Sequence, residues 1–443
     1  MSHHPALSRP LFHDADQNFE AKIVLGSVGA GAGDLGEIFA TLAAVEDGKR
    51  ESWVRAWFAR AQATQQLAQV SESNGRTATA AAQWLRASAY YGHALNAIAA
   101  IGDSDGYANA FAMHRAAWDR FASLRRVPLE GRSIRYGKGS LPGYLQRPDV
   151  PPRDGRSPLL VLVNGSDGTL TDLYSTIGAA AAARGYAVLY FDGPGQQSQL
   201  VAGTHFRPDF EAVLTPVIDH ALGLPGIDGS RIAVYGVSQA GYWVPRALAF
   251  EHRVAAAIVD PGVTDVSTSW VGHLPSPLRH ELAKGDSKHF DQYMKLGLGH
   301  SAAERAVWNF RAKPYASTGY FAVYREVGKY RLSPELAGSI TTPLLITAPE
   351  NEQFWPGQSD ELASFVPDAE LVRFTAVNGA DSHCEPLART AVNEVLLDWL
   401  DARLDARSEA APADARSQAA PADARLGAPE VTREAVATEP TVR

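Results

Sequence analysis

Cysteine and long apolar runs are what this sequence has least of. The single cysteine among its 443 residues, Cys384, excludes an internal disulfide and leaves no thiolate cluster to hold a metal ion. No stretch approaches the roughly 18 consecutive apolar residues of a membrane-spanning helix, and the polar segment 1–18 lacks the apolar core of a secretory signal. We therefore expect a soluble, cytoplasmic protein without a metal or other cofactor.

Long runs of one charge sign are also missing. The net charge of -8 arises from interspersed acidic and basic residues, so no basic surface for nucleic acid or anionic lipid is predicted. The expected partner is a small-molecule substrate, and neither nucleic acid nor a membrane. A hydrophobic content of 45% in a chain of this length is enough for a large core and a second unit.

The part of the chain that follows the N-terminal arm has apolar residues at helical spacing. Trp53, Trp57 and Ala61 recur as on a helix that buries one face. Such aromatic stripes more often pack against neighbouring helices than contact a ligand. We expect an all-helical unit over 19–126.

Residues 127–404 alternate between short β-like runs and alanine-rich helical patterns. This alternation predicts an α/β domain with a mostly parallel sheet covered by helices on both faces. The strands are expected within the runs Ser133–Gly137, Leu141–Pro148, Pro158–Gly165, Ala187–Gly193, Arg231–Ser238, Val254–Gly262, Thr342–Glu350 and Glu370–Phe374.

Two segments depart from this alternation. Residues 264–339 are polar and aromatic with helical spacing, and an insertion so late in a sheet usually packs over the strand ends where ligands bind, so we predict a helical lid. The repeat SEAAPADAR at Ser408–Arg416 and SQAAPADAR at Ser417–Arg425 is rich in alanine and proline. Such a sequence has too little apolar surface to offset its ordering entropy, so the tail 405–443 is predicted to be disordered.

The sequence RIAVYGVSQAGYW carries the strongest catalytic signal. The apolar strand Ile232–Tyr235 runs into the turn GVSQAG and then into a helix. A nucleophile elbow holds its serine on a strained strand-to-helix turn and needs small neighbours so that strand and helix can approach closely. Gly236, Ala240 and Gly241 supply them, with alanine at the fifth position where glycine is usual. We predict that Ser238 is a nucleophile.

A serine hydroxyl needs an adjacent base and an anion that orients the base. In this fold the chain order is serine, acid, histidine, and His383 is the one histidine beyond the last predicted strands. The acid loop APENEQFWPGQ offers Glu350 and Glu352, and either could orient the imidazole. In related loops the carboxylate precedes an apolar-proline step, here Trp355-Pro356, which favours Glu352.

The oxyanion needs backbone N–H donors. One is expected from Gln239, directly after the nucleophile, and the second from Gly165 or Ser166 in the loop NGSDG, with no preference between them. Other candidates have weaker support. We expect a structural role for Asp192 and a packing role for Cys384. Asp265, Trp270 and Tyr242 are candidates for substrate contacts. For an aspartate such as Asp265, however, an Asx turn is the more common role.

Together these motifs resemble a known family. RASAYY at Arg86–Tyr91, LPGYL, NGSDGT, DGPGQ, GVSQAG, ENEQFWPGQ and SHCEP are similar to the hydrolases related to 2,6-dihydroxypseudooxynicotine hydrolase and to the fungal yellowish-green pigment polyketide-shortening hydrolase, and more distantly to FrsA-like esterases. The resemblance implies an α/β-hydrolase fold, a homodimer paired through the helical domains, and the triad Ser238, Glu352 and His383. This chain has glutamate where the family's acid is commonly aspartate.

The resemblance also implies a reaction. We expect cleavage of a carbon–carbon bond beside a ketone, or of an ester, in an aryl ketone or polyketide-like molecule through an acyl-enzyme. The alternatives are a non-hydrolytic eliminase or cyclase of a biosynthetic pathway on the same scaffold, in which histidine acts mainly as a base, and a binding protein that keeps the fold without catalysis.

Overall fold

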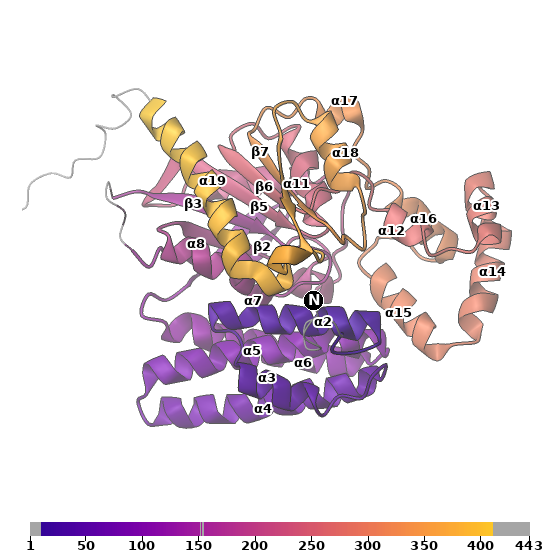
Figure 1. The fold of residues 1–443 in the computed structure, drawn as a ribbon, viewed down its shortest axis with the longest axis horizontal. Coiled ribbons are helices and arrows are strands. Elements are labelled where there is room, and N and C mark those ends of the chain that lie inside the picture. The colour runs from indigo at the N-terminus through magenta and orange to yellow at the C-terminus, as the bar shows by residue number, and fades with distance from the viewer. Residues whose placement is uncertain (1–9, 151, 153–154, 411–443) are drawn as a thin grey trace, which may run out of the picture.

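A single eight-stranded sheet forms the centre of the structure (Figure 1). The structure is a computed structural model and describes residues 10–150, 152 and 155–410, with the side chains of 406–410 left aside. The strand order is β1-β2-β4-β3-β5-β6-β7-β8. The strands are β1 (Glu130–Tyr136), β2 (Gly139–Gln146), β3 (Ser157–Val163), β4 (Ala187–Phe191), β5 (Ile227–Val237), β6 (Ala256–Asp260), β7 (Leu344–Pro349) and β8 (Glu370–Phe374).

The direction of the strands follows from their connections. β1 and β2 form an antiparallel hairpin, and β2 also pairs antiparallel with β4. From β4 to β8 all neighbouring strands are parallel, because helical crossovers connect them. All eight runs predicted to contain strands do so, and the predicted α/β-hydrolase fold with a mostly parallel sheet is confirmed.

The two faces of the sheet are buried in two separate cores. Along β3, Leu159 and Val161 belong to one core and Leu160 and Leu162 to the other, because successive side chains of a strand point to opposite faces. The first core contains the helices α10 (Glu211–Leu222) and α11 (Ala240–Leu248); the second contains α8 (Ala179–Ala183) and α19 (Arg389–Ala410). Near-complete burial on both faces explains why the central strands are almost continuously apolar.

The helical unit lies beneath the second core as a separate layer, coloured indigo to purple in Figure 1. Its aromatic residues, among them Trp53 and Trp57, form a third core between the helices. The helices are α2 (Ala15–Gly26), η1 (Ser27–Ala30), α3 (Leu35–Leu42), α4 (Arg50–Ser73), α5 (Thr77–Ala100) and α6 (Ser104–Leu124).

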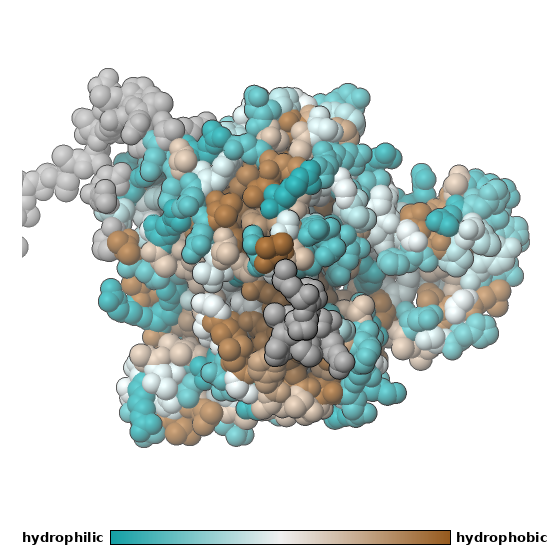
Figure 2. All heavy atoms as spheres, viewed as in Figure 1, coloured by the Kyte–Doolittle hydropathy of each residue, from teal (hydrophilic) through white to brown (hydrophobic). Residues whose placement is uncertain are grey.

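The segment between β6 and β7 projects from the sheet domain as a helical lobe (Figure 1). Figure 2 shows mostly hydrophilic residues over the displayed surface of this lobe. Its helices are α12 (Thr268–Val271), α13 (Ser276–Lys284), α14 (Ser287–Gly299), α15 (Ala302–Ala312) and α16 (Tyr320–Val327). The last helix before β7, α17 (Pro334–Ala337), packs instead against α11 of the sheet domain.

The remaining helical elements lie in the loops that surround the strand ends. They are α7 (Leu170–Leu173), the π-helical turn η2 (Tyr174–Gly178), α9 (Gln197–Val201), α18 (Gln358–Phe365), η3 (Ala376–Asn378) and η4 (Pro386–Ala388). None of the helices in the described part of the chain is long and apolar enough to cross a membrane.

Two boundaries differ from the sequence-based expectation. The first described helix begins at Ala15, inside the predicted arm 1–18, because Asp14 accepts a hydrogen bond from the Gln17 N–H and caps it. The last helix continues to Ala410, past the predicted limit at 405. The rest of the predicted disordered tail, 411–443, lies outside the described residues, as do residues 1–9 of the arm.

Trp118 of α6 joins the helical unit to the sheet. Its fully buried ring packs edge-on or tilted against the rings of Phe121, Tyr144, Tyr174 and Tyr190, with centroid distances of 5.4 to 6.0 Å. The contacts span α6, β2, η2 and β4. One side chain therefore connects two layers of the protein.

We predict that Trp118→Ala lowers the free energy of unfolding by about 3–5 kcal/mol, because the substitution leaves a cavity where the two layers meet. Urea denaturation followed by circular dichroism measures the change. Leu67→Ala is the matched control, since Leu67 of α4 is 52% exposed and should change the stability by less than about 0.5 kcal/mol. Equal effects of the two substitutions would contradict the prediction.

Candidate active site

Ser238 lies on a sharp turn between β5 and α11. Its φ of 57° falls in the left-handed region that a residue with a side chain seldom adopts. The Ser238 N–H donates to the backbone oxygen of Asp260 at 2.6 Å. A Cβ on Gly241 would lie 1.9 Å from the backbone oxygen of Pro261, and one on Gly236 would lie 2.6 Å from the Val244 side chain. The small residues of GVSQAG are therefore required, because neighbouring atoms approach the backbone of this turn too closely for larger side chains.

The side chains of Ser238, His383 and Glu352 form one hydrogen-bonded chain. His383 Nε2 lies 2.9 Å from Ser238 Oγ, and His383 Nδ1 lies 2.7 Å from Glu352 Oε2. The side chains of His383 and Glu352 are 5% and 6% exposed. The three residues come from the turn after β5, the loop after β7 and the loop after β8. The structure thus brings together three residues that are far apart in the sequence.

Glu352 is held in place by its own loop. Its Oε1 accepts hydrogen bonds from the N–H groups of Phe354 and Trp355, at 2.8 and 3.1 Å. Burial by itself would raise the pKa of Glu352, but His383 and these two N–H groups stabilise the carboxylate and lower the pKa below its usual value. Glu350 instead accepts a hydrogen bond from the Ala376 N–H at 3.0 Å. Of the two candidate acids, only Glu352 contacts the imidazole.

Aromatic residues surround the imidazole of His383. The ring of Phe354 packs edge-on against it at a centroid distance of 4.7 Å, and Trp355 lies at 5.7 Å. Phe19 of α2 approaches it at 6.1 Å. The same helix reaches the histidine loop a second time, where Lys22 Nζ donates to Ser382 Oγ at 2.8 Å. The helical unit therefore shields His383 from bulk water.

A cavity of about 370 Å³ opens in front of Ser238. It lies between the helical unit, the sheet domain and the projecting lobe, and all three contribute to its wall. The lobe supplies Trp270, Arg311 and Tyr315. The volume suits a small-molecule ligand, which proteins commonly bind in a concave and mainly apolar site.

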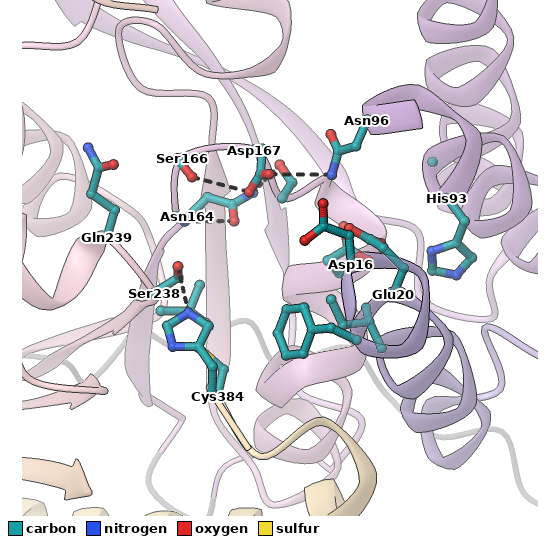
Figure 3. Close-up of a pocket in the computed structure, with 18 of the residues that line it drawn as sticks. Asp16, Glu20, His93, Asn96, Asn164, Ser166, Asp167, Ser238, Gln239 and Cys384 are labelled. Carbon is teal, nitrogen blue, oxygen red and sulfur yellow. Dashed lines mark hydrogen bonds between the residues drawn. The ribbon is translucent and has the colours of Figure 1, made fainter. Parts of the chain in front are cut away.

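The cavity wall that faces Ser238 is acidic. Asp16 and Glu20 of α2 lie across the cavity from Ser238, and Asp167 lies between the two sides (Figure 3). Burial, together with the charges of Asp167, Asp172 and Asp16, raises the pKa of Glu20 to about 8. Burial also raises the pKa of Asp167. Because the neighbouring carboxylates add to the effect of burial, Glu20 favours its protonated form at neutral pH. No motif or periodicity in the sequence predicted this acidic wall.

The candidates for the oxyanion hole all line the cavity. Gln239, Gly165 and Ser166 surround Ser238, and Ser166 and Asn164 are drawn above it in Figure 3. A Cβ on Gly165 would lie 2.9 Å from the Cβ of Ser238, so the loop after β3 approaches the turn as closely as glycine permits.

The three candidates for substrate contacts lie in different surroundings. Asp265 forms an Asx turn, in which it accepts hydrogen bonds from the N–H and the hydroxyl of Ser267. Tyr242 is fully buried behind the elbow, where its hydroxyl donates to the backbone oxygen of Pro208. Neither residue lines the cavity, whereas Trp270 does.

The residues expected to be structural are held by several contacts. Cys384 is buried, its Sγ lies 3.2 Å from the backbone oxygen of Asp260, and burial raises the pKa of its thiol well above the usual range. Asp192 accepts hydrogen bonds from Arg115 of α6 and from Ser198, both at 2.5 Å. Asp192 therefore fixes the turn after β4 to the helical unit.

A buried charged cluster under the elbow was not predicted. Asp260 is fully buried, and its side chain contacts Arg389 at 3.1 Å, the Tyr235 hydroxyl at 2.6 Å and the Thr347 hydroxyl at 2.9 Å. Burial and the carboxylate of Asp260 raise the pKa of the adjacent Glu385 well above its usual range. The motifs VDPG and SHCEPLAR contained Asp260, Glu385 and Arg389, but a sequence pattern does not reveal which loop charges meet in the core.

Comparison with known proteins identifies the family. A family model described as "Esterase FrsA-like" matches residues 35–269, more than half of the chain. The chain belongs to the FrsA-like esterase family. Its FrsA-like relatives include alpha/beta hydrolase psoB of Aspergillus fumigatus, 30% identical over 76% of this chain and 80% of the relative. Hydrolase LUC6 of Fusarium sp is 29% identical over 88% of this chain and 97% of the relative.

Another curated relative and a solved structure also match this chain. The 20-hydroxy-prefusarin hydrolase FUS2 of Gibberella moniliformis is 32% identical over 58% of this chain and 63% of the relative. Among solved structures, 2,6-dihydroxy-pseudo-oxynicotine hydrolase matches with a TM-score of 0.67 at 19% identity, over 86% of this chain and 96% of that chain. The predicted family resemblance is confirmed, and this FrsA-like protein is a hydrolase.

The acidic wall predicts a pH-dependent stability. The folded state raises the pKa of Glu20 from 4.5 to about 8, so it binds the proton more tightly than the unfolded chain does. The stabilisation that protonated Glu20 contributes below pH 4.5 is therefore lost as the pH rises to about 8. Glu20→Gln mimics the protonated acid and should be more stable than the wild type at pH 9 by on the order of 1–2 kcal/mol. This free energy is smaller than the full pKa shift would give, because water in the cavity screens the charge.

Urea denaturation of both proteins at several pH values between 4.5 and 9 measures this difference. Glu51→Gln is the control, because Glu51 is exposed on α4 and its replacement should have the same small effect at every pH. A difference between Glu20→Gln and the wild type that does not change with pH would show that the folded state does not raise the pKa of Glu20.

Proposed function

We propose that this hydrolase is a serine hydrolase with Ser238 as nucleophile, His383 as general base and Glu352 as the orienting acid. The observation that carries the proposal is the hydrogen-bonded chain from Ser238 Oγ through both ring nitrogens of His383 to Glu352 Oε2, at 2.9 and 2.7 Å. Both distances are those of a base within reach of the proton it removes and of an anion that fixes the imidazole tautomer.

The reaction follows from these positions. His383 Nε2 accepts the Ser238 proton while Oγ attacks the substrate carbonyl carbon, and backbone N–H groups stabilise the oxyanion. When the tetrahedral intermediate collapses, the bond to the leaving group breaks and His383 returns the proton to that group. Water, activated by His383, then attacks the acyl-enzyme, releases a carboxylic acid and restores the Ser238 hydroxyl.

The substrate class that we propose is an aryl ketone or a polyketide-like molecule, cleaved at a carbon–carbon bond beside the ketone or at an ester. A carbon leaving group must depart as an enolate or an electron-rich aromatic carbanion, since an unstabilised carbanion is too basic. Two features support this class. The cavity wall contains Phe19, Trp270 and Tyr315, and relatives such as 20-hydroxy-prefusarin hydrolase bear names of this kind of substrate.

A fluorophosphonate probe tests the nucleophile. We expect the wild type to form one covalent adduct, located at Ser238 by peptide mass spectrometry, because the probe requires an activated serine. Ser238→Ala should form none. An unlabelled wild type, or a Ser238→Ala protein labelled at the wild-type rate, would overturn the proposal.

Hydrolysis itself is tested by turnover of a candidate aryl ketone in water enriched in oxygen-18. A carboxylic acid product that contains one heavy oxygen from the solvent supports an acyl-enzyme opened by water. A product that contains no oxygen from the solvent would instead support the non-hydrolytic eliminase or cyclase.

The two glutamates of the acid loop form a matched pair. Glu352→Gln should lower the maximal rate of fluorophosphonate labelling by about 10³- to 10⁴-fold, because an amide cannot stabilise the imidazolium and favours the wrong tautomer. Glu350 is two residues away and does not contact His383. The labelling rate of Glu350→Gln should therefore stay within about threefold of the wild-type rate. Similar losses in both variants would exclude Glu352 as the specific partner of the imidazole.

A further inference from the structure

Gln196, in the turn DGPGQ after β4, contacts the loop that faces the nucleophile. Its side chain is buried, with 3% of the residue exposed. Its Nε2 donates to two consecutive backbone oxygens, of Asn164 at 2.7 Å and of Gly165 at 2.9 Å. Its Oε1 accepts the Gly193 N–H at 2.9 Å. Every polar atom of the side chain is therefore engaged, and two of its three bonds fix the direction of carbonyl groups beside Ser238.

The direction of a carbonyl group also fixes that of the next N–H. In a trans peptide the C=O and the following N–H point in opposite directions. The oxygen of Gly165 points toward Gln196, so the N–H of Ser166 points away from Gln196. Gly165 packs directly on Ser238, and the peptide that Gln196 holds is therefore the one next to the nucleophile.

The two candidate donors of this loop differ in availability. The Gly165 N–H already donates to Asn164 Oδ1 at 2.9 Å, and Asn164 Nδ2 donates in turn to the Gly168 oxygen. Within the described part of the chain, the N–H groups of Ser166 and Gln239 donate to no protein acceptor. Both residues line the cavity in front of Ser238. Two unused backbone donors thus border the nucleophile, one from each loop.

We propose that Gln196 is the positioning residue of the oxyanion hole, and that by holding the carbonyls of Asn164 and Gly165 it directs the Ser166 N–H, together with the Gln239 N–H, at the oxyanion. This inference rests on the proposed role of Ser238. Glutamine suits the task because one amide nitrogen has two donors for two carbonyls, whereas a carboxylate has none. Donors fixed before the reaction need no reorganisation as charge develops.

Gln196→Met tests the role, since methionine is similar in volume but has no N–H donor. The readouts are the maximal rate of fluorophosphonate labelling, the half-saturating probe concentration, and the affinity for a trifluoromethyl ketone, which forms a tetrahedral adduct with serine. We expect the maximal rate and the ketone affinity to fall together by about 10²-fold, with the half-saturating concentration changed by less than about threefold. A purely structural role would not lower the maximal rate and the ketone affinity while leaving the half-saturating probe concentration nearly unchanged.

Gln358→Met is the matched control. Gln358 is also a buried glutamine that bridges two loops, with Oε1 accepting the N–H groups of Thr264 and Asp265 and Nε2 donating to the Asp265 oxygen. It has no contact with the loop after β3. Its replacement should lower the melting temperature while leaving the maximal labelling rate and the ketone affinity each within about threefold of the wild type. An equal loss of ketone affinity in both variants would overturn the proposal.

Two further measurements do not depend on the stability of Gln196→Met. Gln196→Glu keeps an acceptor for the Gly193 N–H and should show the same loss at pH 8, where a carboxylate cannot donate. A crystal structure of the wild type with the trifluoromethyl ketone should place the adduct oxygen within 2.7–3.1 Å of the N atoms of Ser166 and Gln239. An adduct oxygen bound by the Gly165 N–H would overturn the inference, whereas a wild type that reacts with neither reagent would overturn the proposed function.

Discussion

Two hydrogen bonds to the imidazole of His383 connect three loops of the sheet domain. Each loop has its own constraint: Ser238 has a positive φ, Glu352 is fixed by two backbone N–H groups, and the loop of His383 is packed against α2. The imidazole can face both partners only if all three constraints are satisfied together. The parallel strands achieve this, because their carboxyl ends bring the loops to one edge of the sheet.

Asp260 connects these loops from below. Its backbone oxygen accepts the Ser238 N–H and contacts the Cys384 thiol, and its side chain pairs with Arg389 at the start of α19. Arg389 in turn donates to the backbone oxygen of Cys384. One buried residue therefore contacts both the turn of Ser238 and the loop of His383. Breaking such a pair would leave an uncompensated charge in the core, which is strongly destabilising.

The sequence allowed the sheet, the elbow and the contact between Glu352 and His383 to be predicted, because each depends on local pattern and chain order. Side-chain direction could not be predicted for Tyr242, which follows the elbow closely in sequence but lies on the buried side of α11. Asp265 forms the Asx turn that is the more common role for such an aspartate. The acidic wall was missed because α2 and the loop after β3 are far apart in the chain, and no periodicity links Glu20 to Asp167.

The segment that shapes part of the cavity is separate from the segments that carry Ser238, Glu352 and His383. The insertion begins after β6 and ends before β7, so its length can change without altering the register of either strand. It nevertheless supplies Trp270, Arg311 and Tyr315 to the cavity. A change in this segment can therefore alter the cavity wall while leaving Ser238 and His383, the proposed nucleophile and base, in place.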